Sequence, residues 1–329
     1  MPDYLPVSDR PAVSETPALL ALFAGALAIG SAGIFVRLSE TGPTATAFWR
    51  GALALPALAL WAWLERRGQP AAGAPPSLRN PLFLWAGVFF AGDLALWHTA
   101  LLRTSIAAAT LEANCAPILV TLFAWAWWRQ RPRPAFLGAL ALAFGGMLLI
   151  LAPKLGGGSH ALVGDGLGLG TACFYAAYLL AVARLRTRYG TGIVMLISTL
   201  VFTVLLLPLA LMQRFWPVTA QGWWLLIGCA LSAQVLGQGL IAYALAHLPA
   251  TFSAVGLYVQ VIAAALYAWL LLDERLAPVQ IVGGIVVLAA IALARRTHAG
   301  PQDAADAPPP PHEQRASIQS SAPRHSESR

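Results

Sequence analysis

Long runs of apolar residues, separated by short polar or proline-rich breaks, dominate the chain. A helix needs about 20 mostly apolar residues to cross the hydrocarbon core of a bilayer. Backbone polar groups cannot stay unpaired in lipid and the runs show no alternating polarity, so we expect membrane-spanning helices rather than barrel strands. Ten runs approach the required length: Pro17 to Val36, Thr44 to Leu64, Pro81 to Leu102, Ser105 to Trp128, Ala135 to Ala152, Gly166 to Ala183, Ile193 to Met212, Gly222 to Ala246, Ala250 to Leu272 and Pro278 to Ala294.

The composition agrees with a membrane protein. Of 329 residues, 58% are hydrophobic and 11% are charged, whereas soluble domains carry about 25% charged residues. Lysines and arginines are scattered between the apolar runs, so we expect no nucleic acid partner, which would need clustered charge. Cys115, Cys173 and Cys229 lie inside apolar runs without CxxC spacing, which indicates packing residues rather than a disulfide framework.

Polar ends flank the apolar region. We expect residues 1–16 to be a polar leader and residues 297–329, rich in Pro, Ala, Ser and charge, to be a disordered tail. The first run is longer than a signal-peptide core and nine more runs follow it, so it should remain in the mature protein.

Arginines gather after the even-numbered runs. Because cytoplasmic loops carry an excess of Lys and Arg, the bias predicts that both termini face the cytoplasm. The opposite loops hold single cations. The clustered residues are Arg66, Arg67 and Arg79, then Arg129, Arg131 and Arg133, then Arg184, Arg186 and Arg188, and finally Arg295 and Arg296.

The chain contains an internal repeat. The segment WHTALLRTSIAAATLEANCAPILVTLFAWAWWRQR aligns without a gap with IAYALAHLPATFSAVGLYVQVIAAALYAWLLLDER. The same offset matches the turn after the third run with that after the eighth, and the charged turn after the fourth with that after the ninth. Five spans per half is an odd number, so the halves must be inverted in the bilayer. Inverted repeats are typical of secondary transporters with a central site.

These residues resemble a known family. The segments AFWRGALALPALA, DLALWHTALLRTSIAAATLEANCAPILVTL and YALAHLPATFSAVGLYVQVIAAALYAWLLLDERLAPVQIVGG are similar to EamA-type members of the drug/metabolite transporter superfamily. The resemblance implies an all-α polytopic fold of ten transmembrane helices in two inverted five-helix repeats, 17–153 and 164–296. It also implies an inner-membrane carrier, commonly an exporter of amino acids or other metabolites. The pattern of the family includes a Glu-Arg pair before the last helix of each half. Glu274 and Arg275 match this pair, whereas Gln130 stands in place of the acidic partner of Arg131. The chain also departs from the pattern at Val261, which stands opposite the expected proline, Pro117.

A few ionisable residues lie at membrane depth, where their cost makes them candidates for function. Asp93 and Glu112 lie at similar distances on either side of the turn at Arg103, so their carboxylates could approach each other near Arg50. One interpretation is an ionisable patch that binds protons or a substrate amine. The alternative is a fixed Arg50–Asp93 ion pair that clamps helices. His98 is a candidate for a pH-gated step, although a lone histidine is more often a packing residue.

The second half has neutral polar residues, rather than charged ones, at membrane depth. Gln234 and Gln238 are spaced i, i+4 and should share one face of a helix, with Tyr243 further along. The repeat places Tyr258 opposite Asn114. These groups either line a cavity or form interhelical hydrogen bonds.

Other residues shape the spans. Most tryptophans lie near span ends and should anchor at the interface, whereas Trp49 and Trp97 are candidates for the cavity. Pro117, Pro56 and Pro208 should kink their helices. The glycines of GSAG at Gly30 to Gly33 and of VGG ending at Gly284 should allow close helix packing.

The sequence therefore predicts a bacterial inner-membrane secondary transporter that exports small metabolites, such as amino acids or drugs, by alternating access. Protons are a candidate coupling ion, and the bilayer and a small-molecule substrate are the expected partners. The alternative is a polar-lined channel or facilitator without ion coupling. No HExxH, GxSxG or paired-histidine motif occurs, so we expect no enzyme activity, no cofactor and no metal site. The sequence leaves the oligomeric state open.

Overall fold

The computed structural model describes residues 15–68, 80–100, 112–128, 132–154, 161–272 and 277–298. Several sequence predictions lie outside these residues, among them those for the polar leader and tail and for Arg79, Arg103, Arg129, Gln130, Arg131, Glu274 and Arg275. The described residues form helices without any strand. The expected all-α membrane fold is therefore confirmed.

The helices follow the predicted order of spans. The first half contains α1 (Glu15–Gly30), α2 (Ala32–Leu38), α3 (Pro43–Gly68), α4 (Pro81–Ala100), α6 (Ala116–Trp128), α7 (Pro134–Leu151) and the 3-10 turn η2 (Ala152–Lys154). The second half contains α8 (Ala161–Leu185), α9 (Thr191–Leu211), α10 (Ala220–Cys229), the π-helix η3 (Ala230–Gln238), α11 (Gly239–Ala244), α12 (Ala250–Gly256), α13 (Val259–Leu272) and α14 (Pro278–His298). Within the described residues, eight segments are long and apolar enough to span a membrane, and Pro81–Trp97 and Ala116–Ala126 are shorter apolar helices at the two remaining expected positions.

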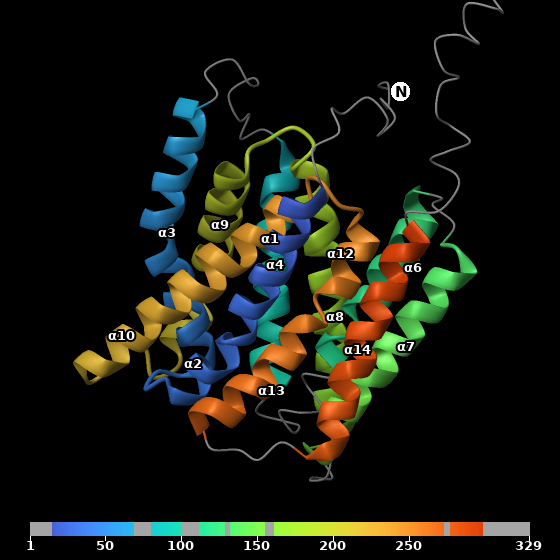
Figure 1. Cartoon of the computed structure of the whole chain (residues 1–329). Helices are drawn as coiled ribbons and strands as arrows, with labels where there is room; N and C mark the ends of the chain where they lie inside the picture. Colours follow the sequence, from blue (N-terminus) through green and yellow to red (C-terminus); the bar gives the residue numbers. More distant parts are fainter. Residues whose placement is uncertain are drawn as a thin grey trace, which may run out of the picture.

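Helices of the two halves pack against each other in pairs. Helix α7 runs beside α14, α3 beside α9, and α4 beside α8 (Figure 1). We call the end of the bundle at which α1 begins and α14 ends the upper end, as it is drawn in Figure 1. Helix α10 begins at the opposite, lower end. Pairing between fifth and tenth spans, and between second and seventh, gives the two halves equivalent places in the bundle.

Two spans are broken at positions that the repeat aligns. The fourth span has a turn at Asn114 and Cys115, directly before Pro117 near the start of α6. The ninth span has a turn at Leu257 and Tyr258, after α12 ends at Gly256. The fourth span, expected to kink at Pro117, is thus interrupted just before this residue, and the ninth span is interrupted at the aligned place although Val261 stands there instead of a proline. In contrast, Pro56 and Pro208 lie inside continuous helices.

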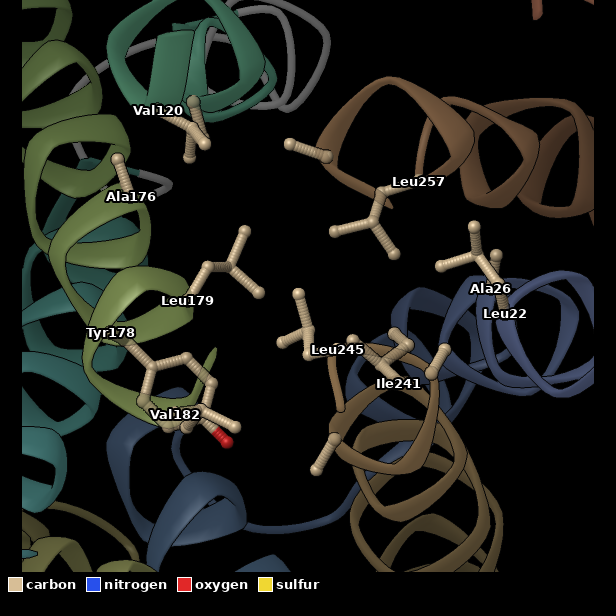
Figure 2. Close-up of a cluster of buried hydrophobic side chains, with 14 of the residues drawn as sticks. Leu22, Ala26, Val120, Ala176, Tyr178, Leu179, Val182, Ile241, Leu245 and Leu257 are labelled. Carbon is tan, nitrogen blue, oxygen red and sulfur yellow. The ribbon is translucent and has the colours of Figure 1, made fainter. Parts of the chain in front are cut away.

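A buried apolar cluster fills the upper part of the interface between the halves. Figure 2 shows Leu22 and Ala26 of α1, Leu179 of α8, and Ile241 near Leu245 converging on one another. These side chains are between 0% and 5% exposed. In a membrane such packing supplies dispersion contacts and close fit rather than a hydrophobic driving force.

Glycines bring α7 and α14 into backbone contact. A Cβ atom added at Gly146 would lie 2.9 Å from the Gly283 carbonyl oxygen, and one added at Gly283 would lie 2.6 Å from the Gly146 carbonyl oxygen. A Cβ at Gly30 of α1 would lie 2.9 Å from the carbonyl oxygen of Gln260. The expectation of close packing is confirmed at Gly30 and Gly283.

We expect Gly146→Ala to destabilise the protein and Gly145→Ala to leave it nearly unchanged. The added methyl group at Gly146 must push α14 away, and such overpacking lowers the free energy of unfolding by about 1–3 kcal/mol. At Gly145 a Cβ atom would meet no atom within 4 Å. Thermal unfolding of the two variants in the same detergent measures the difference, and equal melting temperatures would contradict the packing argument.

Candidate functional site

A cavity of about 360 Å³ lies between the two halves. Helices α1 to α4 and the turn before α6 form one side, and α8, η3 and α13 form the other. The wall is mostly apolar, and its polar members come from both halves. They are Arg37, Arg50, Asp93, Trp97, Asn114, Thr171, Tyr175, Gln238 and Gln260.

Arg50 is held in the cavity wall by contacts with both halves. It is 8% exposed. Its Nε donates a hydrogen bond of 3.0 Å to Oε1 of Gln234, whose Nε2 donates in turn to the Thr199 hydroxyl at 2.9 Å. The guanidinium carbon lies 5.6 Å from the centre of the Phe90 ring, in range for a cation–π interaction. A buried cation needs such partners, and they fix the side chain in one position.

Asp93 brings the opposite charge to the same cavity from α4. Its side chain is 8% exposed, and Arg50 acts on its carboxylate electrostatically. Among the residues that the structure describes, none donates a hydrogen bond to Asp93 or forms an ion pair with it. The Asp93 carboxylate therefore keeps its hydrogen-bond capacity for a molecule or ion that enters the cavity.

Tyr175 of α8 and Gln238 of η3 add two oxygen atoms on the wall of the second half. The hydroxyl of Tyr175 and Oε1 of Gln238 are buried, and within the described chain neither has a hydrogen-bond partner. The two side chains are close enough to act on each other, without reaching hydrogen-bond geometry. Buried polar atoms without partners are rare in native proteins and call for an explanation.

The two broken spans meet at the cavity. Nε2 of Gln260, just after the break in the ninth span, donates a hydrogen bond of 3.1 Å to Oδ1 of Asn114 in the break of the fourth span. Both side chains line the cavity. Broken helices at equivalent positions of inverted repeats are the best pointer to a central binding site.

The apolar cluster of Figure 2 closes the upper side of this cavity. Four of its members lie about one helical turn above lining residues, as the directions of the helices show. Ala26 lies above Gly30 on α1, Leu179 above Tyr175 on α8, Ile241 above Gln238 on η3 and α11, and Leu257 above Val261 at the start of α13. In the other direction, the lining reaches Arg37 near the end of α2 and Ala268 in α13. The cavity thus extends toward the lower end and is sealed above.

Hydrogen bonds join the helix ends above the seal. Arg186 donates from Nε to the Ala242 carbonyl at 3.0 Å and from Nη1 to the Tyr189 carbonyl. Burial lowers the pKa of Arg186 from its usual value. The Glu65 carboxylate at the end of α3 accepts from the N–H groups of Thr191 and Gly192 at 2.8 and 2.7 Å, and so caps α9.

A second carboxylate caps a helix at the lower end. Oε2 of Glu40 accepts hydrogen bonds from the N–H groups of Val218 at 2.7 Å and Thr219 at 3.0 Å, and Oε1 accepts from the Thr219 hydroxyl. Thr219 is the N-cap of α10, and its hydroxyl also accepts from the Gly222 N–H group. These bonds lower the pKa of Glu40, the hydroxyl bond most. Glu40 therefore ties the first half to the start of α10.

The structure brings five of the predicted residues together around the cavity. Arg50, Asp93, Trp97, Asn114 and Gln238 line it, and Gln234 supports Arg50 from behind. Gln234 and Gln238 lie on one helix as expected, but that helix, η3, is a π-helix. Single π-helical segments occur frequently at functional sites.

Other predicted residues lie apart from the cavity. The Glu112 carboxylate lies against Gly168 of α8, so the expected carboxylate pair with Asp93 is replaced by a contact between helices. Tyr243 packs against His247, with ring centres 4.7 Å apart, and Tyr258 is fully buried in the break. Trp49 is not a cavity residue, because its Nε1 donates to the Phe215 carbonyl within an aromatic cluster. The side chain of His98 lies outside the described part of the chain.

Sequence reasoning missed Tyr175 and Thr171. Both lie in the sixth span, in which the sequence indicated no candidate, and the available signal was a tyrosine in the middle of a span. Within the described residues, no group of three or more His, Cys, Asp or Glu side chains could hold a metal ion.

Comparisons with known proteins agree on one family. The model of the EamA-like transporter family matches residues 16–152 and 162–296. Over 218 residues, 65% of this chain and 75% of the other, the sequence is 29% identical to the pseudopaline exporter CntI of Pseudomonas aeruginosa (strain UCBPP-PA14). It is 27% identical over 289 residues, 85% of this chain and 97% of the other, to an uncharacterized transporter of Archaeoglobus fulgidus.

A solved structure shares the fold. One crystal structure superposes with a TM-score of 0.74, covering 86% of this chain and 99% of that chain at 16% sequence identity. At this identity the similarity concerns the fold alone.

We expect the stabilising effect of Glu40 to depend on pH. A carboxylate whose pKa is lowered by folding stabilises the folded state above the ordinary pKa of about 4.3 and loses this effect as pH falls through the lowered value. Glu40→Gln should therefore lower the melting temperature at neutral pH, and the gap to wild type should close on acidification. Melting curves from neutral to acidic pH in one detergent test this, and a gap that stays constant would contradict the assignment.

Proposed function

The chain belongs to the EamA-like transporter family, and we propose that it is a secondary carrier that exports a small metabolite by alternating access. That it is a multi-pass membrane transporter follows from the family and from the apolar helices. The observation that carries the proposal is a central cavity between the halves that is sealed on one side by the cluster in Figure 2.

A seal on one side distinguishes a carrier from a channel. A carrier closes its site on each side in turn, through rocking of one bundle against the other, whereas a channel needs a continuous polar path when open. The upper seal consists of apolar side chains from both halves, including Leu22, Leu179 and Leu257. The repeat-related breaks beside the cavity are suitable hinges, because unwound turns absorb changes of backbone angle.

Orientation and direction rest on two further arguments. The arginine bias favours an orientation in which the upper end, where α1 begins and α14 ends, faces the cytoplasm of a bacterial inner membrane. The cavity would then face outward in the conformation described here. Export is favoured because a relative is named an exporter of pseudopaline, although that name identifies only the substrate of the relative.

Asp93 is our candidate for proton coupling. A buried carboxylate that lines the cavity and has no fixed donor can exchange protons with the side to which the cavity is open. Arg50 faces the same cavity and is held by Gln234 rather than paired with Asp93. The Asp93 carboxylate can thus change its protonation without breaking an ion pair between helices.

We expect Arg186→Gln to open the upper side more often. The test uses Ala264→Cys as a reporter in the cavity, with Cys115, Cys173 and Cys229 replaced by serine, and an impermeant maleimide applied from either side of oriented vesicles. Loss of the Arg186 bonds to Ala242 and Tyr189 should raise labelling from the upper side about tenfold, because hydrogen bonds to charged groups contribute about 1.5–3 kcal/mol.

Arg188→Gln is the matched control, since Arg188 lies exposed on the same turn. It should label like the unmodified background. Before Arg186 is changed, labelling should be faster from the lower side than from the upper. Equal rates from both sides would support a channel and contradict the carrier.

We expect Asp93→Asn to flatten the pH dependence of transport. The neutral amide cannot bind and release a proton, whereas Glu112→Gln should have a smaller effect because its carboxylate lies outside the cavity. A thermal-shift screen of metabolites on purified protein identifies a substrate, and counterflow in liposomes between about pH 5.5 and pH 8 measures its transport. If Asp93→Asn keeps the wild-type pH profile, proton coupling through Asp93 is excluded.

A further inference from the structure

Helices α6 and α7 are consecutive in the chain but pack against different partners. Helix α6 packs mainly against α8 and α12, whereas α7 packs mainly against α14 at the margin of the bundle (Figure 1). A groove of about 270 Å³ remains between α6 and α7. It is lined by Thr121, Leu122, Trp125, Pro132 and Leu137. Among the described residues, none lines both this groove and the central cavity.

The walls of the groove face the lipid. Leu122, Trp125 and Leu137 are 46%, 49% and 45% exposed, although they belong to the fourth and fifth spans. Thr121 is the polar member, and its hydroxyl donates to the Pro117 carbonyl of the same span at 2.9 Å. A gap in a lipid-facing surface forfeits dispersion contacts unless lipid fills it. The groove therefore takes an apolar ligand from the bilayer.

The size of the groove favours an acyl chain over a helix of another protein. One turn of an α-helix with its side chains, about 10 Å wide and about 5.4 Å long, occupies on the order of 400 Å³. This exceeds the volume of the groove, whereas an acyl chain is much narrower than a helix. Thr121 and Trp125 lie about one turn apart along α6, so a chain in the groove lies parallel to the helices, as lipid chains do in a bilayer.

A cation stands at the upper mouth of the groove. Arg133 follows the lining residue Pro132, and its carbonyl oxygen accepts the N–H group of Leu137 at 3.1 Å. Arg133 therefore lies one turn above Leu137, where α7 begins and the lipid headgroups are expected. Basic residues at pockets between membrane helices bind anionic headgroups. The half-exposed Trp125 can donate its indole N–H group to an ester or phosphate oxygen.

The internal repeat supplies a comparison. With the same offset, it aligns the three exposed side chains of the groove with residues of the second half that are also lipid-facing, between 38% and 54% exposed: Leu266, Trp269 and Ile281. The position of Arg133, in contrast, is occupied by Ala277. The apolar face thus occurs in both halves, whereas the cation at this position occurs only in the first half, at the upper end.

We propose that the groove between α6 and α7 binds one acyl chain of an anionic phospholipid whose phosphate group lies against Arg133. The apolar walls hold the chain, and the arginine gives the site its preference for negative headgroups over zwitterionic ones. With the upper end toward the cytoplasm, the lipid comes from the cytoplasmic leaflet. The site lies outside the central cavity, so the inference goes beyond the proposed carrier function and does not rest on it.

Native mass spectrometry of the purified full-length protein, delipidated in detergent, measures the affinity for the first bound lipid. The probes are palmitoyl-oleoyl phosphatidylglycerol and phosphatidylcholine, which share their acyl chains. Phosphatidylglycerol should bind more tightly. Arg133→Gln should weaken its binding about fivefold, the effect of one basic residue near an anionic lipid surface, and leave phosphatidylcholine unchanged. Arg188→Gln is the matched control, because it removes an exposed arginine at the same end of the bundle.

A second pair of variants tests the groove itself. Leu137→Trp fills the groove with a larger side chain and should weaken binding of phosphatidylglycerol at least as much as Arg133→Gln does. Leu142→Trp is its control, because Leu142 is 43% exposed on the same helix and lies outside the lining of the groove. Melting curves without added lipid verify that the variants are folded.

Three results would overturn the proposal. Equal binding of the two lipids, or equal losses in Arg133→Gln and Arg188→Gln, would mean ordinary contact with the bilayer. Equal binding by Leu137→Trp and Leu142→Trp would exclude the groove as the place of binding. A doubled mass that is lost in Leu137→Trp would assign the groove to a second copy of the chain. These measurements involve no transported substrate, so they stand whether or not the protein is a carrier.

Discussion

The structure depends on one constraint: polar groups at membrane depth must be satisfied within the protein, because lipid offers them no partner. Helices satisfy the backbone, and hydroxyl side chains bond back to their own helix. The Thr121, Ser198 and Thr203 hydroxyls donate to the carbonyl oxygens of Pro117, Val194 and Thr199. Arg50 obeys the same constraint through Gln234 and Phe90. Asp93, Gln238 and Tyr175 line the cavity, and within the described residues the Tyr175 hydroxyl and Oε1 of Gln238 have no hydrogen-bond partner of good geometry.

The same constraint explains how the ends of the helices are tied. The first N–H groups of any helix lack acceptors inside the helix. Two carboxylates of the first half accept hydrogen bonds from such N–H groups in helices of the second half. Glu65 caps α9 at the upper end, and Glu40 caps α10 at the lower end. Glu40 precedes α3 and Glu65 lies in its last turn, and α3 packs along α9. Close glycine contact between α7 and α14 joins the halves elsewhere. The two repeats are thus joined at the helix ends as well as along the paired helices.

Equivalent positions of the two repeats have different surroundings, and this difference gives the cavity its direction. Asn114 and Tyr258 are aligned by the repeat and both lie in broken spans. Asn114 lines the cavity and accepts a hydrogen bond from Gln260, whereas Tyr258 is fully buried beside the apolar cluster. In a carrier with inverted repeats, exchange of these two environments would move the opening from one side to the other. The conformation described here is one of the two states that the proposed mechanism requires.

The sequence by itself determined the all-helical membrane fold, the order of the spans and the close packing at Gly30 and Gly283, because length, hydropathy and glycine act locally along the chain. It also indicated Arg50, Asp93, Asn114 and Gln238 as polar groups at membrane depth. Only the tertiary structure decided which of them meet. Glu112 was expected at the depth of Asp93, yet its carboxylate lies against Gly168 of α8, and Tyr175 lines the cavity from a span without a predicted candidate. The π-helix at Gln234 and Gln238 also escaped prediction. Depth follows from position along a helix, but the direction of a side chain depends on the rotation of that helix against its neighbours, which packing across the two halves sets.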